Sequence, residues 1–374
     1  MRGRPQPSPR HSLGTILCLL LLAACSLTPR HVEPGLPLPP VTADGTRLLA
    51  GGRPFEVRGV NFVRISNADE SRCWMFQFGA DPRCPWDAAA IEADLDRYRA
   101  LGVNTVRVFL NYYVFGGQRK VDESYDKSGA LAHLEDFVDA ANRRGIYVIP
   151  VLLIEYPQDR FGPEHDERTL ELHVRPVVRL LADRPGVLAW DLFNEPDIGS
   201  PVDERCWDWD NGDFPLCFTL AEERMRFVQM IHDEVKRLDP DTLTTVGMAF
   251  AKSYFEPAEA ELRMADVVDF YSFHYYDDEP YNSGRYRQHW YYGKGLPDDM
   301  RRGIAELHAL GLEKPVVVTE VGFPTGEGAT RTIADLHRDT RVALEAAREE
   351  SAAGLVLWSF QKTPEELVGE LFKR

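Results

Sequence analysis

The chain has 374 residues, of which 44% are hydrophobic, and this is enough to bury a large core. Its formal net charge is −16, which argues against nucleic acid or anionic lipid as a binding partner. A neutral polysaccharide is compatible with that charge, although acidity can also serve solubility alone.

The first 24 residues predict a lipoprotein signal peptide. Three arginines precede an apolar stretch at 13–22, which is too short for a typical transmembrane span. The stretch ends in Leu22, two alanines and Cys25, which resembles the lipobox in which a bacterial lipoprotein carries its lipid. The alternative is an ordinary cleaved signal with an incidental cysteine. We expect an exported protein, anchored by lipid at Cys25 to a bacterial membrane, in the periplasm or at the cell surface.

Residues 25–44 are rich in proline and predict an extended tether, and residues 45–374 predict one domain that begins near a short hairpin at 42–58. Eight apolar segments then predict strands at 55–63, 103–111, 146–154, 187–194, 242–249, 267–274, 314–320 and 354–360. Helical patterns alternate with them at 88–101, 130–144, 168–183, 219–238, 257–264, 299–310, 330–350 and 363–373. Eight strands, each followed by a helix, indicate an α/β fold, the (β/α)8 TIM barrel. A doubly wound open sheet is the alternative, but the chain lacks a phosphate-loop glycine pattern.

Two of the predicted strands lead to a glutamate. The strand at 187–194 runs directly into Glu195, and the strand at 314–320 ends at Glu320. A carboxylate at the end of a buried strand is costly unless it has a partner or a function. Because the active sites of such barrels lie at the carboxyl ends of the strands, we expect the two carboxylates to share one cleft. Paired carboxylates are the chemistry of glycoside hydrolysis.

Further polar and aromatic residues fall at the same ends of the predicted strands: Asn61, Arg107, Asn194, His274, Tyr276 and Trp358. The motifs are Asn-Glu-Pro at 194–196, His-x-Tyr at 274–276, Thr-Glu-x-Gly at 319–322, and the tryptophan of the last strand. Together they resemble clan A of the glycoside hydrolases, and within it the family 5 cellulases and mannanases. The resemblance covers roughly residues 45–374.

The resemblance implies that Glu195 is the general acid/base and Glu320 the nucleophile of a retaining double displacement. The remaining matched residues would serve substrate binding and the network around the glutamates. Arg107 and Tyr276 would keep Glu320 ionised, and Asn194 would hold the sugar 2-hydroxyl group. His274 would orient this network or contact sugar, and Trp358 would offer a flat face to the sugar ring. Asn61 is a further candidate at the end of its strand. No metal and no organic cofactor is expected.

One segment departs from the family pattern. Many members carry a histidine just after the third strand, whereas residues 153–157 of this chain contain none. This puts a typical cellulase subfamily in doubt. Glu155 or Tyr156 is the candidate for a substrate contact at this place.

Four cysteines remain beyond Cys25, and an exported protein meets an oxidising compartment. Three pairings are open, and equal short loops favour the local pairs Cys73–Cys84 and Cys206–Cys217. A zinc site is the rival interpretation, but no Cys-x-x-Cys spacing supports it.

Aromatic residues crowd both cysteine loops and the segment after the sixth strand, where Trp290 is a candidate substrate contact. Packing of the loops on themselves is the alternative role of these aromatic residues. We expect a hydrolase of a β-linked polysaccharide or oligosaccharide, with a β-1,4-glucan or mannan favoured. A transglycosylase or exo-β-glycosidase of the same clan is the first alternative, and a non-catalytic glycan-binding lipoprotein is the second.

Overall fold

The computed structural model describes residues 37–63, 78–79, 86–115, 128–154, 156–157, 160–198, 215–276, 293–323, 331–358 and 365–373. Residues 34–374 form one compact unit. Several predictions fall outside the described residues: the signal peptide, Cys25, Cys73, Cys84, Cys206, Glu155 and Trp290. They stay predictions, as do the boundaries given to the signal peptide and the tether.

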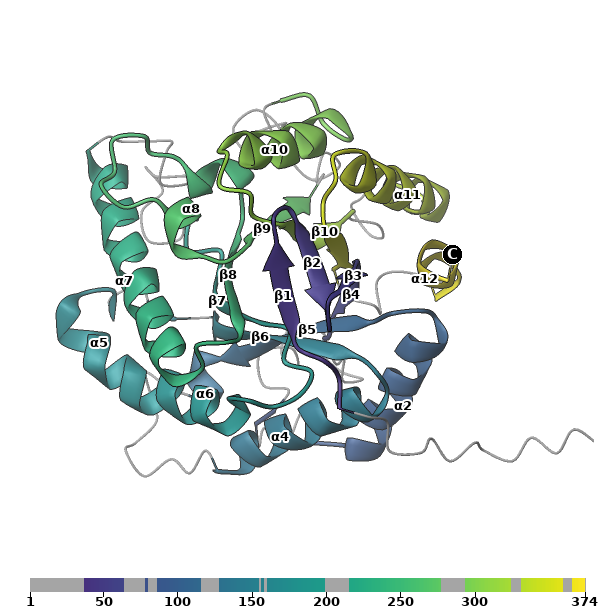
Figure 1. Cartoon of the computed structure of the whole chain (residues 1–374), viewed down its shortest axis with the longest axis horizontal. Helices are drawn as coiled ribbons and strands as arrows, with labels where there is room; N and C mark the ends of the chain where they lie inside the picture. Colours follow the sequence, from purple (N-terminus) through teal and green to yellow (C-terminus); the bar gives the residue numbers. More distant parts are fainter. Residues whose placement is uncertain are drawn as a thin grey trace, which may run out of the picture. The chain divides into compact units, whose positions relative to one another are not determined.

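Eight parallel strands close into a barrel, and helices surround it (Figure 1). In barrel order from the first strand, they are β4 (Val57–Asn61), β5 (Thr105–Asn111), β6 (Tyr147–Ile154), β7 (Ala189–Asn194), β8 (Leu243–Met248), β9 (Tyr271–Tyr276), β10 (Val316–Gly322) and β11 (Gly354–Leu357). Each lies within or beside one of the eight predicted strands. The predicted TIM barrel is therefore confirmed.

The outer ring contains α2 (Ala88–Ala100), α4 (Ser128–Arg143), α5 (Pro163–Thr169), α6 (Arg175–Leu181), α7 (Leu216–Leu238), α10 (Asp298–Ala309), α11 (Ile333–Glu349) and α12 (Glu365–Phe372). The helix predicted at 168–183 is interrupted by a π-helical turn, η2 (Leu170–Val174), between α5 and α6. The helix predicted at 257–264 is wrong. The chain instead forms a 3-10 turn, η3 (Ala251–Tyr254), and one turn of helix, α8 (Met264–Val267). Helix propensity alone does not hold so short a segment without packing. A one-turn helix after β5, α3 (Tyr112–Phe115), was not predicted.

The barrel strands are apolar because both of their faces are buried. All residues of β5 and β6 are buried, so the two strands read as nearly continuous apolar runs rather than as alternating ones. Helices add their apolar stripes from outside, and α2 begins where Asp87 accepts a hydrogen bond from the backbone N–H of Ala90. Burial on both sides fixes the strands, and thereby the positions of the side chains at their carboxyl ends.

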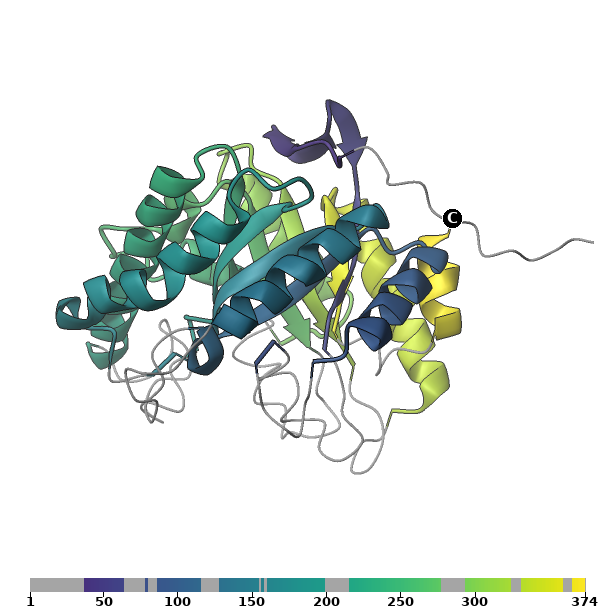
Figure 2. The ribbon, with the colours of Figure 1, turned by 90° about the horizontal axis from the view of Figure 1, so that it is seen from below.

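A three-stranded antiparallel sheet covers the amino-terminal end of the barrel (Figure 2). Its strands are β1 (Val41–Asp44), β2 (Arg47–Ala50) and β3 (Arg53–Phe55), and together they form the predicted hairpin extended by one strand. Leu48 is 1% exposed and packs in a cluster with barrel residues such as Tyr147 and Ile149. We call this sheet the cap. It closes the end of the barrel opposite the glutamates.

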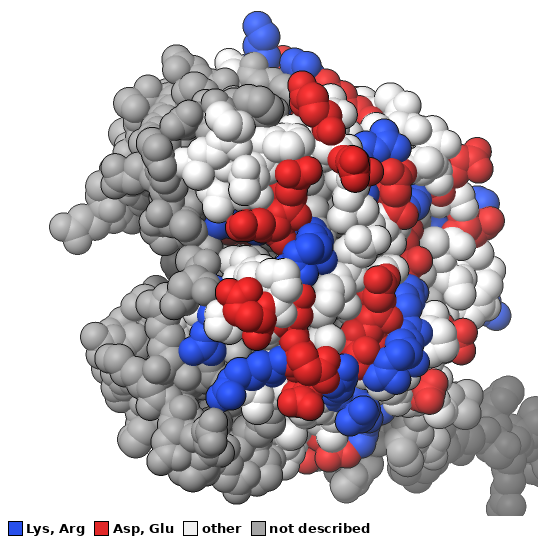
Figure 3. Space-filling model, turned by 90° about the vertical axis from the view of Figure 1, so that its left-hand side faces the viewer, with Lys and Arg blue, Asp and Glu red and all other residues white. Residues whose placement is uncertain are grey.

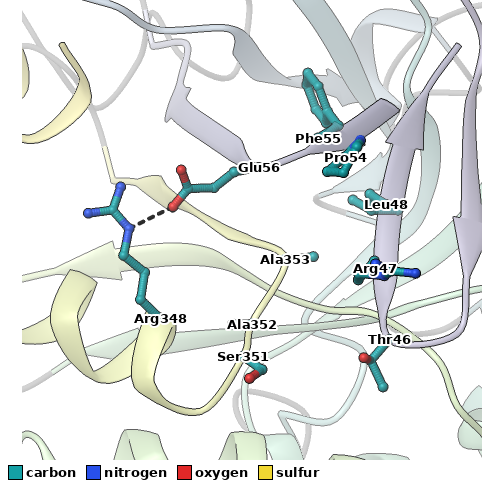
Figure 4. A pocket seen from close by; sticks show the side chains of 10 residues that line it. All are labelled: Thr46, Arg47, Leu48, Pro54, Phe55, Glu56, Arg348, Ser351, Ala352 and Ala353. Carbon is teal, nitrogen blue, oxygen red and sulfur yellow. Dashed lines mark hydrogen bonds and ion pairs between the residues drawn. The ribbon is translucent and has the colours of Figure 1, made fainter. Parts of the chain in front are cut away.

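A shallow pocket of about 310 Å³ lies between the cap and the junction of α11 with β11 (Figure 4). The Arg348 guanidinium and the Glu56 carboxylate form an ion pair of 2.7 Å at its edge. Because Glu56 and Ala353 precede β4 and β11, this pocket is at the amino-terminal end and is separate from the predicted active site.

Acidic and basic side chains alternate on the face drawn in Figure 3, and neither sign forms a large field there. Elsewhere in the described ranges the charged side chains form ion pairs, such as Arg184 with Asp139 and Arg226 with Asp166. Among the helices of the described ranges, none is long and apolar enough to cross a membrane.

Candidate active site

Strands β7, β9 and β10 bring three titratable side chains together at their carboxyl ends. One carboxylate oxygen of Glu195, one of Glu320 and a ring nitrogen of His274 all lie within 4.8 Å of one another. The Glu195 side chain is 26% exposed, whereas that of Glu320 is 5% exposed. The two carboxylates therefore form a close pair in which Glu195 has more access to solvent.

Glu320 is surrounded by hydrogen-bond donors. Arg107 donates from Nη1 to its Oε1 at 2.5 Å, and the Tyr276 hydroxyl donates to its Oε2. Burial raises the pKa of Glu320, while His274, Arg107 and the Tyr276 hydrogen bond oppose that shift. We assign Glu320 the ionised form, because a guanidinium in direct contact stabilises the carboxylate and not the neutral acid.

Arg107 crosses the barrel interior with its side chain fully buried. Its Nε and Nη2 atoms each lie 2.8 Å from Oδ2 of Asp191. It also donates from Nη1 to Asn61 Oδ1 at 3.0 Å and from Nη2 to Asn194 Oδ1 at 2.9 Å. Every polar end of the guanidinium therefore has a protein partner, so Arg107 orients Glu320 and Asn194 from below.

Asn61 is also fully buried, and its amide nitrogen donates to the Thr319 and Leu357 carbonyls at 3.0 and 3.2 Å. The resemblance grouped Asn61 and Arg107 with the substrate-binding residues and expected Arg107 to keep Glu320 ionised. In the structure both side chains are fully buried, and Arg107 contacts Glu320. A direct contact of either residue with substrate stays a prediction. Their contacts join β4 and β5 to the strands that carry the pair.

Glu195 stands just beyond β7 with a backbone φ of 52°, in the left-handed region. Its backbone N–H donates to the Gly247 carbonyl at 2.7 Å, and its Oε1 lies 2.7 Å from Nδ1 of His274. Burial raises the pKa of Glu195 to about 7, with Arg107 lowering it and Asp191 raising it. Burial lowers the pKa of His274 to about 4, so the ring is neutral near pH 7. The Glu195 carboxyl group is therefore hydrogen-bonded to a neutral ring.

Trp358 and Asn194 complete the described rim of the site. Trp358 is partly exposed and packs edge-on against Phe109 and Tyr276, with ring centroids 5.8 and 6.2 Å apart. The Oδ1 atom of Asn194 accepts a hydrogen bond from Arg107, and this directs its NH2 group away from the guanidinium. Both side chains are thus held in position beside the glutamates.

Tyr156, a candidate substrate contact from the sequence, has its side chain packed into the protein. It is 3% exposed, and its hydroxyl lies 2.8 Å from the Arg160 carbonyl and 2.8 Å from the Thr169 hydroxyl. It packs in an aromatic cluster with Phe161 and Phe227 behind the site.

Sequence reasoning missed two residues that support the site. Asp191 is fully buried within β7, and an acidic residue inside an otherwise apolar strand was the available signal. Gly247 gave no signal at all. A Cβ atom at this position would lie 2.6 Å from Arg107 Nη2 and 3.0 Å from His274 Nε2, so these two side chains occupy the space that a larger residue would need.

Cys217 is buried at the start of α7 and is disulfide-bonded. Its partner lies outside the described residues, so the pairing with Cys206 stays a prediction, like that of Cys73 with Cys84.

The chain is similar to proteins that act on mannan. It is 24% identical over 230 residues to mannan endo-1,4-β-mannosidase of Cryptopygus antarcticus, an alignment that covers 55% of this chain and only 57% of that protein. The endo-1,4-β-mannanase of Rhizomucor miehei has the same fold, with a TM-score of 0.62 at 17% identity over 90% of this chain and 100% of that one. An exo-β-1,4-mannosidase from an Opitutaceae bacterium gives a TM-score of 0.63 at 22% identity, over 85% of this chain and 55% of that one.

The family model for cellulase, glycosyl hydrolase family 5, matches residues 52–363. The match spans every strand of the barrel and both glutamates. It agrees with the resemblance seen in the sequence and with the close carboxylate pair. The chain belongs to glycosyl hydrolase family 5 and is a retaining β-glycoside hydrolase.

Proposed function

We propose that this enzyme hydrolyses a β-1,4-linked mannan, with Glu195 as general acid/base and Glu320 as nucleophile. The observation that carries the assignment is the unequal environment of two carboxylates within 4.8 Å of one another. Glu320 contacts a guanidinium and a phenol, whereas Glu195 contacts a neutral imidazole and has a raised pKa. Two carboxyl groups about 5–5.5 Å apart suit the retaining mechanism.

In the first step, a Glu320 oxygen forms a bond to the anomeric carbon while the glycosidic C–O bond breaks. Glu195 gives its proton to the departing oxygen, so the leaving group departs as an alcohol. In the second step, water gives a proton to Glu195, attacks the anomeric carbon and releases the sugar from the ester. Two inversions restore the β configuration at the anomeric carbon.

The neighbouring side chains support these roles. Arg107 and Tyr276 stabilise the negative charge of Glu320. The Tyr276 hydroxyl remains within hydrogen-bond reach of Glu320 Oε2 as the ester forms. The NH2 group of Asn194 is free of the guanidinium and is suited to bind the 2-hydroxyl of the sugar, a contact that strengthens in the transition state. Trp358, held against Phe109, offers a ring face to the sugar whose bond is cut.

Mannan is preferred over glucan as the substrate because all three similar proteins described above act on β-1,4-mannosidic bonds by name. Endo action is the first choice, since two of the three are endo-acting enzymes. Exo action is the second candidate, supported by the fold match to the Opitutaceae exo-mannosidase. Digestion of mannohexaose separates them, because an exo enzyme releases mannose from the first minutes and an endo enzyme releases short oligosaccharides.

The decisive experiment measures reducing-sugar release by residues 26–374 from soluble mannan, β-1,4-glucan and xylan. Release from mannan, lost in Glu320→Gln, is the expected result. Release from glucan alone would show that the substrate is a glucan and not a mannan. Products longer than the starting oligosaccharide would indicate transglycosylation. A folded protein that binds glycan but cuts no polymer, with equal affinity in Glu320→Gln, would be a non-catalytic glycan-binding lipoprotein and not an enzyme.

We further propose that residues 1–24 are a signal peptide, that Cys25 carries lipid, and that the disulfides are Cys73–Cys84 and Cys206–Cys217. The support is the basic and apolar leader, the lipobox resemblance and the short equal loops. Incorporation of labelled palmitate by the wild type but not by Cys25→Ala tests the anchor. Peptide mapping without reduction tests the two pairs.

A further inference from the structure

A third carboxylate, Asp191, lies buried beneath the two glutamates. It is fully buried, and its Oδ2 lies 2.8 Å from both Nε and Nη2 of Arg107. Arg107 in turn donates to Glu320 at 2.5 Å. One guanidinium is therefore shared between two carboxylates, and only Glu320 of these two belongs to the reacting pair.

Sharing alters the charge that each partner experiences. A single positive charge facing Glu320 alone, in a buried environment, stabilises the carboxylate so strongly that its tendency to attack carbon falls. With Asp191 on the other side, the Asp191 and Arg107 charges offset one another. Glu320 remains ionised yet lies beside a nearly neutral pair.

Asp191 also reaches Glu195 through the backbone. Its Oδ1 accepts a hydrogen bond of 2.8 Å from the Gly247 N–H, and the Gly247 carbonyl accepts one of 2.7 Å from the Glu195 N–H. Glu195 is the residue with the left-handed φ of 52°, and this chain of hydrogen bonds helps to hold it there. The negative charge of Asp191 additionally opposes ionisation of Glu195.

We propose that Asp191 is a positioning residue that divides the two glutamates into their roles, by offsetting the charge of Arg107 beside Glu320 and by anchoring Glu195 through Gly247. The proposal rests on the function proposed above. It assigns to Asp191 no contact with substrate, because the side chain is fully buried.

The expected effect on pH follows from the charges that face Asp191. The titratable groups on which Asp191 acts are Arg107 from β5, in direct contact, Glu195 beyond β7, His274 from β9 and Tyr254 from η3. Removing the negative charge favours the ionised form of each carboxyl group nearby, so Glu195 loses its proton at a lower pH. The enzyme then lacks its general acid on the alkaline side of the profile.

The test compares pH profiles of kcat/KM for the wild type, Asp191→Asn and Asp191→Glu. We expect the alkaline limb of Asp191→Asn to move down by about one pH unit. At a given pH on that limb, the kcat/KM of the variant, relative to its own optimum, is then about tenfold lower than that of the wild type. Asp191→Glu retains the charge, so its alkaline limb is expected to remain at the wild-type position even if its overall rate is lower.

Asp197→Asn is the matched control. Asp197 is equally buried and follows Glu195 by two residues, and it accepts hydrogen bonds from the Ala249 and Phe250 N–H groups at 2.9 and 3.0 Å. Asp191 and Arg107 shift the pKa of Glu195, whereas the Asp197 carboxylate is engaged by the Ser253 hydroxyl and by backbone N–H groups after β8. This variant should lower the melting temperature and, because Asp197 also holds the turn that carries Glu195, the overall rate, but the alkaline limb should stay at the wild-type pH.

An unmoved limb in Asp191→Asn, or an equal shift in Asp197→Asn, would overturn the proposal. If Asp191→Asn failed to fold while Asp191→Glu folded, the negative charge would be required for folding, and this result would also overturn the positioning role. These failures differ from failure of the proposed function, in which Glu320→Gln would retain turnover or the wild type would have none.

Discussion

At the scale of single residues, Glu195 is held in a conformation that its own backbone does not favour. A φ of 52° is uncommon for a residue with a side chain; it costs on the order of 1–3 kcal/mol and persists only where the surroundings impose it. The surroundings do so here. Arg224 donates to the carbonyls of Pro196 and Ile198, and Asp197 ties the same turn to the backbone after β8. The strained turn aims the carboxyl group at His274 and Glu320.

The raised pKa of Glu195 also predicts an effect on stability. A carboxyl group whose folded pKa is about 7 binds its proton more tightly in the folded state. Its favourable contribution is complete below pH 4.5 and is lost as the pH rises to about 7, so the ionised group lowers stability above pH 7. We expect Glu195→Gln, which cannot ionise, to melt at a higher temperature than the wild type at pH 8.

The difference in melting temperature should shrink at pH 4.5, where Glu195 of the wild type keeps its proton. Differential scanning calorimetry of both proteins at the two pH values measures it. Equal differences at pH 4.5 and pH 8 would contradict a raised pKa at this position. The replaced side chain keeps its hydrogen bond to His274, so the comparison isolates the charge.

At the scale of elements, the barrel closes where β11 meets β4, and this junction depends on a glycine. Gly354 pairs with Val57 across the two strands and has a φ of 146°. A Cβ atom at this position would lie 2.2 Å from the Val57 carbonyl oxygen and 2.5 Å from the Val57 nitrogen. Neither backbone atom can move without breaking the ladder that completes the barrel.

Gly354→Ala is therefore expected to destabilise the protein by about 2 kcal/mol or more, because it combines a backbone clash with an unfavourable φ. Gly129→Ala is the control, since Gly129 lies in α4 with open space around it. That change should stabilise the protein by about 0.4–1 kcal/mol, because alanine restricts the unfolded chain. Urea unfolding measures the change in the free energy of unfolding of each variant, which should be a loss in Gly354→Ala and a gain in Gly129→Ala. Similar stabilities of the two variants would refute the role of Gly354 in barrel closure.

At the scale of the whole molecule, the barrel has one reactive end and one structural end. The catalytic side chains gather at the carboxyl ends of the strands, while the cap covers the amino-terminal end (Figure 2). Val41 and Leu48 of the cap and Phe270 of the barrel share one apolar cluster. Because the catalytic side chains lie at the opposite end of the barrel, we expect packing at the cap to contribute to stability and not to the chemistry.

Leu48→Ala is expected to lower the free energy of unfolding by about 2–4 kcal/mol, because a side chain that is 1% exposed leaves a cavity. The kcat/KM of the folded variant should equal that of the wild type at every pH. Arg47→Ala is the control, since the neighbouring Arg47 side chain is 66% exposed and should change neither quantity. A shift of the pH profile in Leu48→Ala would show that the cap acts on the active site.

The sequence determined the eight strands, because each is buried on both faces and reads as an apolar run, and it determined the glutamate pair, because Glu195 and Glu320 interrupt that pattern at strand ends. It failed at 257–264, where helix propensity alone does not determine the structure of so short a segment. Only the tertiary structure decided that Asn61 and Arg107 lie below the site, that Tyr156 turns into an aromatic cluster, and that Asp191 and Gly247 support the glutamates. These roles depend on which side chains meet across strands distant in the chain, and the periodicity of one strand carries no record of the facing residues on another.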